Sequence, residues 1–182
     1  GSVRDALLGR LGNDLDFTTP ARPEVVKEIL DEWAETVWDT GIDFGTVSAA
    51  YKGQQIEITT FRSDSYDGQS RNPEVVYGDT LEGDLVRRDF KANAMAIELL
   101  ADASFKFHDP LHGLQDIADR VLDTPDKPEI SFHDDPLRML RAARFASQLE
   151  FRVADRVVEA MRDMAGEIQR ITVERVQVEL DK

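Results

Sequence analysis

The chain has 182 residues, of which 41% are hydrophobic, and this length allows one good core or a compact domain with a smaller helical appendage. No apolar stretch approaches the ~20 residues of a membrane span, no signal-peptide pattern opens the chain, and the absence of cysteine excludes disulfides and thiolate metal sites. Its 36 acidic residues outnumber 22 basic ones and give a net charge of −14, which argues against long-range attraction to a nucleic-acid backbone.

The first part of the chain alternates helical and strand patterns. The predicted elements, in chain order, are a helix at residues 4–8, a strand at 14–19, a helix at 23–38, and strands at 46–51 and 55–61. Pro23 suits the first helical position because its φ is already close to the helical value. The last two strands are rich in β-branched and aromatic residues and flank Lys52-Gly53-Gln54, which indicates a hairpin.

The second part begins with a long polar segment and ends in helices. The predicted elements are a loop at residues 62–82, a helix at 89–95 that Asp89 caps, strands at 96–100 and 104–108, and helices at 136–149, 154–168 and 172–182. We therefore predict an α/β (α+β) head domain, with a mixed sheet flanked by helices, at residues 1–112 and an all-helical neck at residues 113–182. Both ends read as truncated, and the lack of cysteine fits a cytoplasmic protein.

Two aspartates on the first predicted strand carry the main functional signal. Asp14 and Asp16 are two residues apart, so a strand directs both carboxylates to one face and directs Leu15 and Phe17 to the other, into a core. Like charges this close repel by roughly 1 kcal/mol or more, and a divalent metal such as magnesium relieves the repulsion. Glu57 alternates with two isoleucines on a later strand and would be a third carboxylate. The plain alternatives are a surface pair of aspartates and a solvent-facing glutamate.

The first residues of the chain fit a phosphate-binding turn. Gly1 and Ser2 would present backbone N–H groups at the N-terminus of the first predicted helix, where geometry and the helix dipole favour a phosphate. Arg4 would add positive charge. The alternative is a simple tight turn.

Five sequence blocks resemble, in order, the head and neck of one family. The blocks are Gly1-Ser2-Val3-Arg4-Asp5 through Asp16; Arg87-Arg88-Asp89-Phe90 with Asn93-Ala94; Asp109-Pro110-Leu111-His112-Gly113-Leu114-Gln115-Asp116; Asp134-Asp135-Pro136-Leu137-Arg138 with Arg141 and Arg144; and Glu174-Arg175 with Glu179. Over essentially the whole chain they are similar to the class II tRNA nucleotidyltransferase (CCA-adding enzyme) and bacterial poly(A) polymerase family, within the polymerase β-like nucleotidyltransferase superfamily. One Asp-x-Asp motif is weak evidence, whereas five blocks in family order are strong.

The resemblance implies metal-dependent nucleotidyl transfer. Asp14 and Asp16 would hold two Mg2+ ions, with Glu57 as the third carboxylate; one ion would hold the incoming triphosphate and the other would activate the primer 3′-hydroxyl. The resemblance assigns the triphosphate and ribose to a second group of residues, namely Arg87, Arg88, Asp89 and Asn93. Two adjacent arginines cannot face the same way, so we expect one of them to be functional and the other structural. A helix cap is the alternative role of the aspartate.

The resemblance also implies that Asp135 and Arg138 read the incoming base. A carboxylate can accept from an exocyclic amino group and a guanidinium can donate to the neighbouring ring nitrogen, which fits cytosine and adenine. Uracil and guanine present the reverse pattern and would leave buried groups unpaired, at roughly 1–3 kcal/mol each. Arg141 and Arg144 continue the same side of the helix and are further nucleotide-binding candidates. The alternative role of Asp135 is an N-cap directly before Pro136.

Three other segments carry less specific signals. Residues 109–116 lie at the head-to-neck junction and are either a hinge or an ordinary turn. Glu174, Arg175 and Glu179 lie on the last predicted helix, where we expect them to brace the neck. The loop at residues 62–82 either closes over the nucleotide or the primer end, or is simply solvated.

These expectations combine into a leading function and its alternatives. The leading function is the addition of CMP and AMP, from CTP and ATP, to the tRNA 3′ end without a nucleic-acid template. A bacterial poly(A) polymerase and enzymes that add only CC or only A share the motifs, although residues 90–96 look more like the tRNA enzymes. An inactive nucleotide- or RNA-binding module is the alternative of a different class, against which the intact Asp14 and Asp16 argue. Because the chain is acidic, body and tail domains of the family would hold most of the tRNA.

Overall fold

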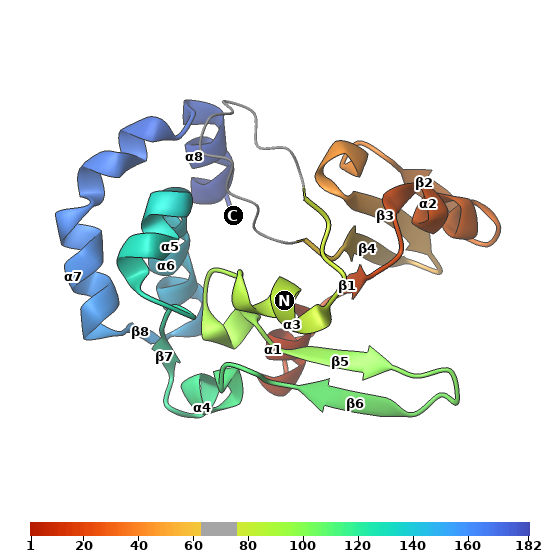
Figure 1. Cartoon of the computed structure of the whole chain (residues 1–182), viewed down its shortest axis with the longest axis horizontal. Coiled ribbons are helices and arrows are strands. Elements are labelled where there is room, and N and C mark those ends of the chain that lie inside the picture. The colour runs from red at the N-terminus through yellow and green to blue at the C-terminus, as the bar shows by residue number, and fades with distance from the viewer. Residues whose placement is uncertain (63–75) are drawn as a thin grey trace. The chain divides into compact units, whose positions relative to one another are not determined.

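The computed structural model describes residues 1–62 and 76–182 of the chain (Figure 1). These residues form two compact units, Gly1–Arg87 and Arg88–Lys182. The predicted division into domains at residues 1–112 and 113–182 rests on motifs rather than on compactness, and it stays a prediction. None of the helices within the described ranges is long and apolar enough to cross a membrane.

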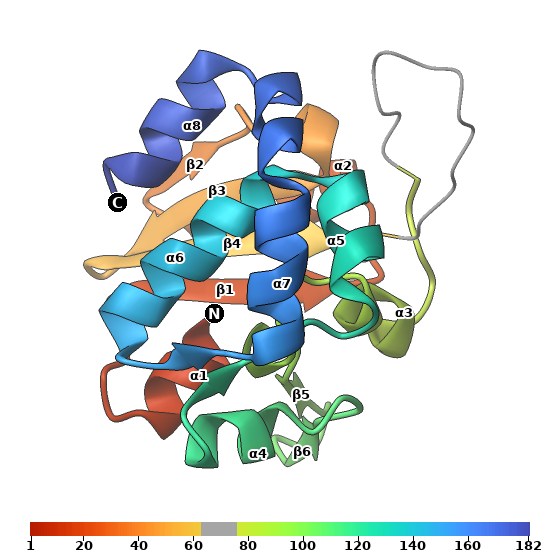
Figure 2. The same ribbon diagram turned by 90° about the vertical axis from the view of Figure 1, so that its left-hand side faces the viewer.

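The first unit contains a four-stranded mixed sheet with the strand order β1-β4-β3-β2 (Figure 2). Its strands are β1 (Asp14–Thr19), β2 (Thr36–Trp38), β3 (Thr46–Tyr51) and β4 (Gln54–Thr60). Strand β1 runs parallel to β4, whereas the other two pairs are antiparallel. The helices of this unit are α1 (Ser2–Leu7), α2 (Pro23–Asp31), the 3-10 helix η1 (Ile42–Phe44) and α3 (Leu81–Val86). The predicted mixed sheet with flanking helices is confirmed.

Helix α2 packs on one face of this sheet. Val26 and Leu30 of α2 form a buried cluster with Val47 and Ala49 of β3. Because alternate residues of a strand point to opposite faces, the polar residues between these apolar positions point away from α2. The opposite face of the sheet is therefore the polar one.

Strand β1 lies at the edge of the sheet, and one predicted core residue remains exposed there. Leu15 is half-buried, whereas 38% of Phe17 is exposed. The prediction that both enter a core is therefore wrong for Phe17. A helix about 10 Å wide covers only about two strands spaced about 4.8 Å apart, and α2 packs mainly on the inner strand β3.

The helix predicted to run through Trp38 ends earlier, at Asp31. The segment that follows forms the edge strand β2, in which Val37 lies opposite a residue of β3. The Glu35 N–H donates to the carbonyl oxygen of Ala50 at 3.0 Å and begins this pairing. The helical spacing of Val37 is therefore a coincidence, since pairing with a neighbouring strand decided its conformation.

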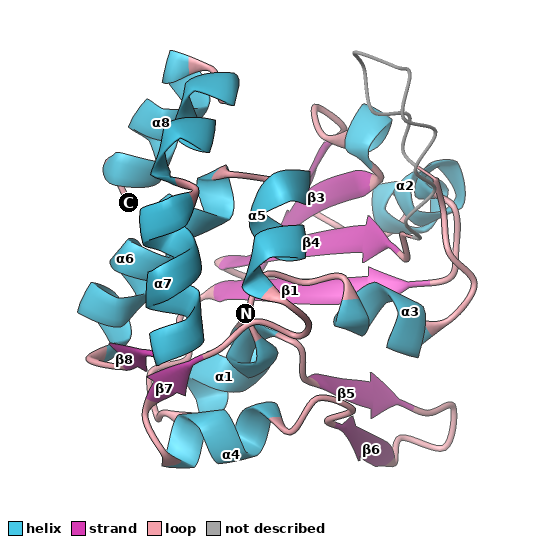
Figure 3. Cartoon of the chain, turned by 60° about the vertical axis from the view of Figure 1, so that its left-hand side comes forward, coloured by secondary structure: helices cyan, strands magenta, loops and turns pink. Residues whose placement is uncertain are grey.

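The second unit is mainly helical after a short hairpin (Figure 3). Its elements are η2 (Lys91–Asn93), β5 (Ala96–Leu99), β6 (Phe105–His108), α4 (Gly113–Ala118), β7 (Val121–Leu122), α5 (Pro128–Asp134), α6 (Leu137–Leu149), β8 (Arg152–Val153), α7 (Asp155–Asp163), η3 (Ala165–Arg170) and α8 (Val173–Leu180). Phe132, Met139, Val157 and Ala160 form a buried cluster that joins α5, α6 and α7. The helical C-terminal region is confirmed, with the two-residue parallel pair β7–β8 as an unpredicted addition.

The helix predicted from Asp89 to Met95 is a single 3-10 turn, η2. The Lys91 N–H donates to the carbonyl oxygen of Asp123 at 3.0 Å, so it is not available to continue an α-helix. Asp89 instead accepts from the Phe90 N–H at 2.8 Å. A hydrogen bond to a distant residue overrode the local pattern, which is why the sequence alone was misleading here.

Candidate functional site

The register of β1 and β4 places the three predicted carboxylates on one face of the sheet. Asp16 lies opposite Glu57, and Asp14 lies opposite Gln55. Directly paired residues of neighbouring strands point to the same side, so the three carboxylates share the face that points away from α2. All three are exposed. We call Asp14, Asp16 and Glu57 the carboxylate face.

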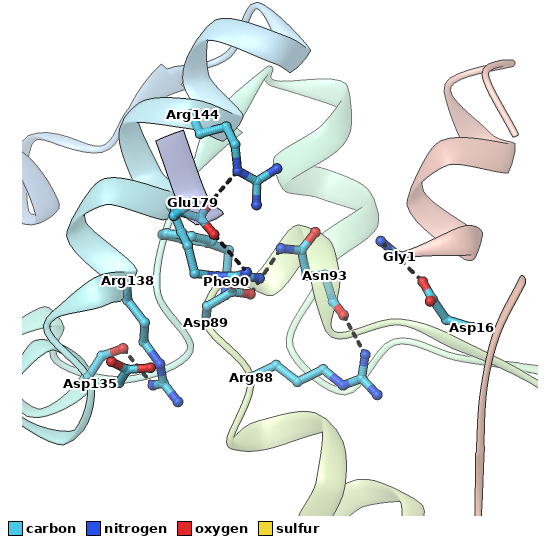
Figure 4. A network of polar contacts seen from close by, with 12 residues as sticks. Gly1, Asp16, Arg88, Asp89, Phe90, Asn93, Asp135, Arg138, Arg144 and Glu179 are labelled. Atoms are coloured by element: carbon cyan, nitrogen blue, oxygen red, sulfur yellow. Dashed lines mark hydrogen bonds and ion pairs between the residues drawn. The ribbon is translucent and has the colours of Figure 1, made fainter. Parts of the chain in front are cut away.

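Two residues at the start of α1 lie beside the carboxylate face. Ser2 Oγ accepts from the Asp16 N–H at 2.8 Å and lies 3.5 Å from Oδ2 of the same residue. The amino group of Gly1 lies 3.7 Å from this oxygen (Figure 4). Arg4, by contrast, is only 7% exposed and forms hydrogen bonds of 2.8 and 2.9 Å with Asp5. Phosphate binding by Gly1, Ser2 and Arg4 stays a prediction.

The carboxylate face offers the donors that magnesium prefers without enclosing an ion. Across residues 1–62 and 76–182, no three His, Cys, Asp or Glu side chains are grouped so that they could hold a metal ion. In many phosphate-handling sites, Mg2+ is held by one or two protein carboxylates, while water and substrate phosphates complete its shell. The two exposed aspartates fit this open mode of binding. Metal binding by Asp14 and Asp16 stays a prediction.

Asp89 is the centre of a buried network in the second unit. It is 8% exposed, and its carboxylate accepts from the Asn93 side chain at 2.9 Å and from Arg141 Nε at 2.8 Å. Burial raises the pKa of the Asp89 carboxyl, but the charge of Arg141 and the hydrogen bonds from Asn93, Arg141 and the Phe90 N–H outweigh burial and bring the pKa below its ordinary value. The carboxylate is therefore ionised and holds η2 to α6.

The network continues to helix α8 through Glu179, which Figure 4 shows beside Arg144. Glu179 of α8 is 3% exposed, accepts from Arg144 Nε at 2.6 Å and lies 3.8 Å from Arg141 Nη1. The Arg144 guanidinium also lies over the Phe145 ring, 4.2 Å from its centroid. Glu179 thus braces α8 against α6, as expected. Both arginines are engaged with protein groups, and their contact with a nucleotide stays a prediction.

The two adjacent arginines of the second block fall in different compact units. Arg87 directly follows α3 and is its C-terminal cap residue. Arg88 begins the second unit, and its Nη1 lies 3.5 Å from the carbonyl oxygen of Asn93. Both side chains are half-buried. A role in binding the triphosphate stays a prediction for each of them.

Asp135 lies just before α6 and is held at both carboxylate oxygens. Pro136 is the N-cap residue of α6, so the cap predicted at Asp135 is displaced by one residue. Asp135 Oδ1 nevertheless accepts from the Leu137 N–H at 3.2 Å, a contact of the kind that a capping side chain makes. Arg175 of α8 donates to Oδ2 at 2.9 Å, which is the bracing contact expected of the last helix.

Arg138 lies beside Asp135 on the first turn of α6 (Figure 4). Its Nη1 donates to Ser131 Oγ at 2.8 Å. Ser131 was not among the predicted site residues, and the one available signal was its position between two apolar residues, Ile130 and Phe132. Because Pro136 interrupts the helical pattern, no spacing rule connects Ser131 with Arg138.

Residues 109–116 contain the start of helix α4. The Asp109 carboxylate accepts from the N–H groups of Gly113 and Leu114 at 2.6 and 3.0 Å. A Cβ at position 113 would collide with the carbonyl oxygen of Lys91, so this close approach requires glycine. The block is locally a capped helix start, and its role as a hinge stays a prediction.

Asp116 on α4, the last residue of the third sequence block, is a buried acid to which the sequence assigned no role of its own. It is 9% exposed, and its Oδ2 has no hydrogen-bond partner within the part of the chain that the structure describes. Burial raises its pKa to about 6; the charge of Lys91 opposes this shift, whereas Asp123, Asp119 and Asp109 add to it. Asp116 is thus poorly stabilised as an anion.

The predicted polar loop after Arg62 is described only at its ends. Residues 63–75 lie outside the described residues. Arg62 pairs with Tyr77 in an isolated antiparallel bridge. Thr80 then caps the unpredicted helix α3, where its Oγ1 accepts from the Gly83 N–H at 3.2 Å. Closure of this loop over a nucleotide or primer stays a prediction.

Known families match both parts of the chain. Residues 1–123 match the model described as the poly A polymerase head domain. Residues 150–182 match the model described as the probable RNA and SrmB-binding site of polymerase A.

Individual relatives and solved structures are similar to the chain over nearly its whole length. The chain is 42% identical to the CCA-adding enzyme of Lactobacillus helveticus over 183 residues, which is 100% of this chain and 44% of that enzyme. Among solved structures it resembles the Bacillus stearothermophilus CCA-adding enzyme in complex with CTP, with a TM-score of 0.84, 38% identity, and coverage of 99% of this chain and 42% of that chain. It also resembles a tRNA nucleotidyltransferase complexed with a primer tRNA and an incoming ATP analogue, with a TM-score of 0.81, 29% identity, and coverage of 100% and 50%.

The chain spans less than half the length of the curated relative it matches. The head-domain match, however, covers more than half of this chain. It confirms the resemblance to class II tRNA nucleotidyltransferases and bacterial poly(A) polymerases, and the chain belongs to the poly A polymerase head-domain family.

Proposed function

We propose that the full-length protein containing this chain is a magnesium-dependent nucleotidyltransferase that adds CMP and AMP, from CTP and ATP, to the tRNA 3′ end without a nucleic-acid template. The observation that carries the proposal is the carboxylate face, where the strand register aligns Asp16 with Glu57 and leaves Asp14 on the same side. The similarity to CCA-adding enzymes, and the CTP, ATP analogue and primer tRNA in similar solved structures, support the choice of substrates.

The carboxylate face would bind the metal. Bound Mg2+ would neutralise the triphosphate charge and lower the pKa of the primer 3′-hydroxyl. Asp14 and Asp16 are the proposed ligands and Glu57 the third carboxylate, because exposed carboxylates of like charge are stabilised by a hard cation. Ser2 would keep Asp16 in place through the hydrogen bond that its Oγ accepts from the backbone.

A larger group of residues would bind or position the nucleotide. The proposed members are Gly1, Ser2, Arg4, Arg87, Arg88, Asp89, Asn93, Arg141 and Arg144. Within this group Asp89, Asn93 and Arg141 are linked by hydrogen bonds. We propose that these three act together by fixing η2 against α6.

Base selection would lie with Asp135 and Arg138. Cytosine and adenine place an amino donor next to a ring-nitrogen acceptor, which an Asp–Arg pair can satisfy. Uracil and guanine place a ring N–H where the guanidinium donates, so two donors would face each other. The protein side chains would thus replace a nucleic-acid template.

The test is nucleotide addition by the full-length protein to a tRNA trimmed of its terminal CCA. We expect CMP addition with CTP alone, completed CCA with CTP and ATP together, and much slower addition with UTP than with CTP. Asp14→Ala and Asp16→Ala should abolish addition, whereas Asp43→Ala, which removes an exposed carboxylate of η1, should not. Retained activity in both site variants would contradict the metal site and favour a different centre or a contaminating enzyme.

A second candidate, bacterial poly(A) polymerase, is favoured by the description of the matching head-domain model. Long tails made from ATP alone on any RNA would support it and contradict tRNA specificity. Addition of only CC or only A would indicate one of the restricted enzymes. Nucleotide binding with no addition under any condition would indicate an inactive binding module.

The acidic chain leads to a separate proposal about the tRNA. Because its net charge is −14, we propose that residues beyond this chain hold most of the tRNA. Residues 1–182 alone should bind tRNA much more weakly than the full-length protein in a filter-binding assay. Equally tight, salt-sensitive binding by both would contradict this.

A further inference from the structure

Ser131 is a buried hydroxyl whose partner is the proposed base-reading arginine. The Ser131 residue is 7% exposed on α5, and its Oγ accepts from Nη1 of Arg138 at 2.8 Å. A hydrogen bond to a charged donor is stronger than one between neutral groups, and a buried oxygen left without a donor is costly. The contact is therefore expected to persist in the folded protein.

This contact restricts the orientation of the guanidinium. The backbone of Arg138 is already held by the first turn of α6, where its N–H donates to the Asp135 carbonyl oxygen at 3.0 Å. An arginine side chain has many rotamers, but its guanidinium is planar and presents its N–H groups in a rigid fork. Holding Nη1 at Ser131 therefore restricts the side chain to rotamers that reach this oxygen, and so limits the directions in which its other N–H groups point.

We propose that Ser131 is a positioning residue for base selection, which acts by orienting the Arg138 guanidinium and does not touch the nucleotide. The inference rests on the proposed function, because it takes Arg138 as the residue that donates to the base. Rejection of uracil and guanine requires the donors of Arg138 to face the ring N–H of the wrong base. A guanidinium that can turn away from this N–H escapes the clash, so loss of the Ser131 contact should weaken discrimination.

The test compares Ser131→Ala with a matched control in the full-length protein. The measured quantity is the ratio of kcat/KM for CTP to kcat/KM for UTP, with trimmed tRNA as primer. We expect Ser131→Ala to lower this ratio by about tenfold, the scale of one hydrogen bond to a charged group. Ser147→Ala, an exposed serine on α6, should leave the ratio unchanged. An unchanged ratio in Ser131→Ala would overturn the proposal.

A double variant separates action through Arg138 from a general packing effect. If Ser131 acts through the guanidinium, Ser131→Ala combined with Arg138→Ala should have the ratio of Arg138→Ala alone. Independent, multiplicative losses would overturn the inference. An unchanged ratio in Arg138→Ala would instead show that the proposed base reading is wrong.

A third variant keeps the test decisive if Ser131→Ala unfolds. Ser131→Cys keeps nearly the same volume but offers only a weak sulfur acceptor, so it should lower the ratio in the same direction. Thermal unfolding would verify that the variant is folded. A folded Ser131→Cys variant with the original ratio would overturn the proposal.

Discussion

Acidic side chains are exposed on the carboxylate face of the first unit, whereas they are buried and paired in the network of the second unit. We call this second group, which consists of Asp89, Arg141, Arg144 and Glu179, the arginine network. Asp14 and Glu57 are exposed and form no ion pair with any residue that the structure describes. Asp89 and Glu179 are 8% and 3% exposed, and both contact arginines of α6. The first arrangement leaves negative charge available to a cation, whereas the second has already neutralised it.

This difference in burial suggests different roles, with the exposed carboxylates serving activity and the buried ion pairs serving stability. An exposed carboxylate is stabilised by water and loses little when it is neutralised. A buried carboxylate must keep its partner, because removing one member of a buried pair leaves the other charge uncompensated. Substitutions on the carboxylate face should therefore affect activity without lowering stability, whereas substitutions in the network should lower stability in addition to any effect on nucleotide binding.

The largest expected effect is on stability, in Glu179→Ala. This change would leave Arg144 and Arg141 without their shared carboxylate, so we expect the free energy of unfolding to fall by about 3–5 kcal/mol. Urea unfolding would measure the loss. Glu174→Ala, at an exposed position of the same helix, should change stability by less than about 0.5 kcal/mol. If both variants lowered the free energy of unfolding by a similarly small amount, the proposed difference between the carboxylate face and the arginine network would be contradicted.

The next effect is on activity, in Glu57→Gln. Loss of the third carboxylate should lower kcat/KM for CTP by roughly 10²–10³-fold, the scale reported for removing one electrostatic contact to a transition state. The melting temperature should stay the same, because the residue is exposed. Asp43→Asn is the control and should retain activity. Activity of Glu57→Gln within about threefold of the unmodified protein would mean that Glu57 is simply a solvent-facing residue.

Asp116→Asn tests a third environment of an acidic side chain, which is burial without a strong partner. Its folded pKa of about 6 lies above the ordinary value for aspartate, so folding favours the protonated form. The stability contributed by this group is greatest below about pH 4 and is lost as the pH rises through about 6. Asp116→Asn should therefore gain about 1–2 kcal/mol relative to the unmodified protein between pH 4.5 and 7.5, measured by urea unfolding.

The control for this pH dependence is Gln177→Ala, which removes no titratable group from an exposed position of α8. Its stability relative to the unmodified protein should be nearly independent of pH in this range. The opposite sign applies to Asp89, whose lowered pKa contributes stability that is lost as the pH falls. An Asp116→Asn difference that is equal at both pH values would contradict the burial argument.

The smallest effect is expected for Arg175→Ala. Its ion pair with Asp135 joins side chains that are 51% and 30% exposed, so it should contribute only about 0–1 kcal/mol. We expect a small fall in melting temperature and a change of less than about threefold in the ratio of CTP to UTP use. Arg162→Ala, at an exposed position of α7, is the control. A loss of discrimination larger than that of Ser131→Ala would shift the main positioning role to Arg175.

The sequence predicted an element correctly where the spacing of its own residues, such as the two-residue alternation of a strand, agrees with its hydrogen bonding and burial in the structure. Strand β1 has the bounds that were predicted, and its alternation placed Asp14 and Asp16 on one face before any pairing was known. The prediction failed where a distant partner decided the backbone. The Lys91 N–H bonds to Asp123, and Val37 pairs with β3, so neither continued its predicted helix.

The sequence by itself determined the family, the mixed sheet, the helical end and the two aspartates, because each is encoded in residues that are close in the chain. Only the tertiary structure decided which charges remain exposed and which are paired. Arg141 meets Asp89 across 52 positions and Arg144 meets Glu179 across 35. A buried charge must find a partner somewhere, but packing, rather than spacing, selects which residue supplies it.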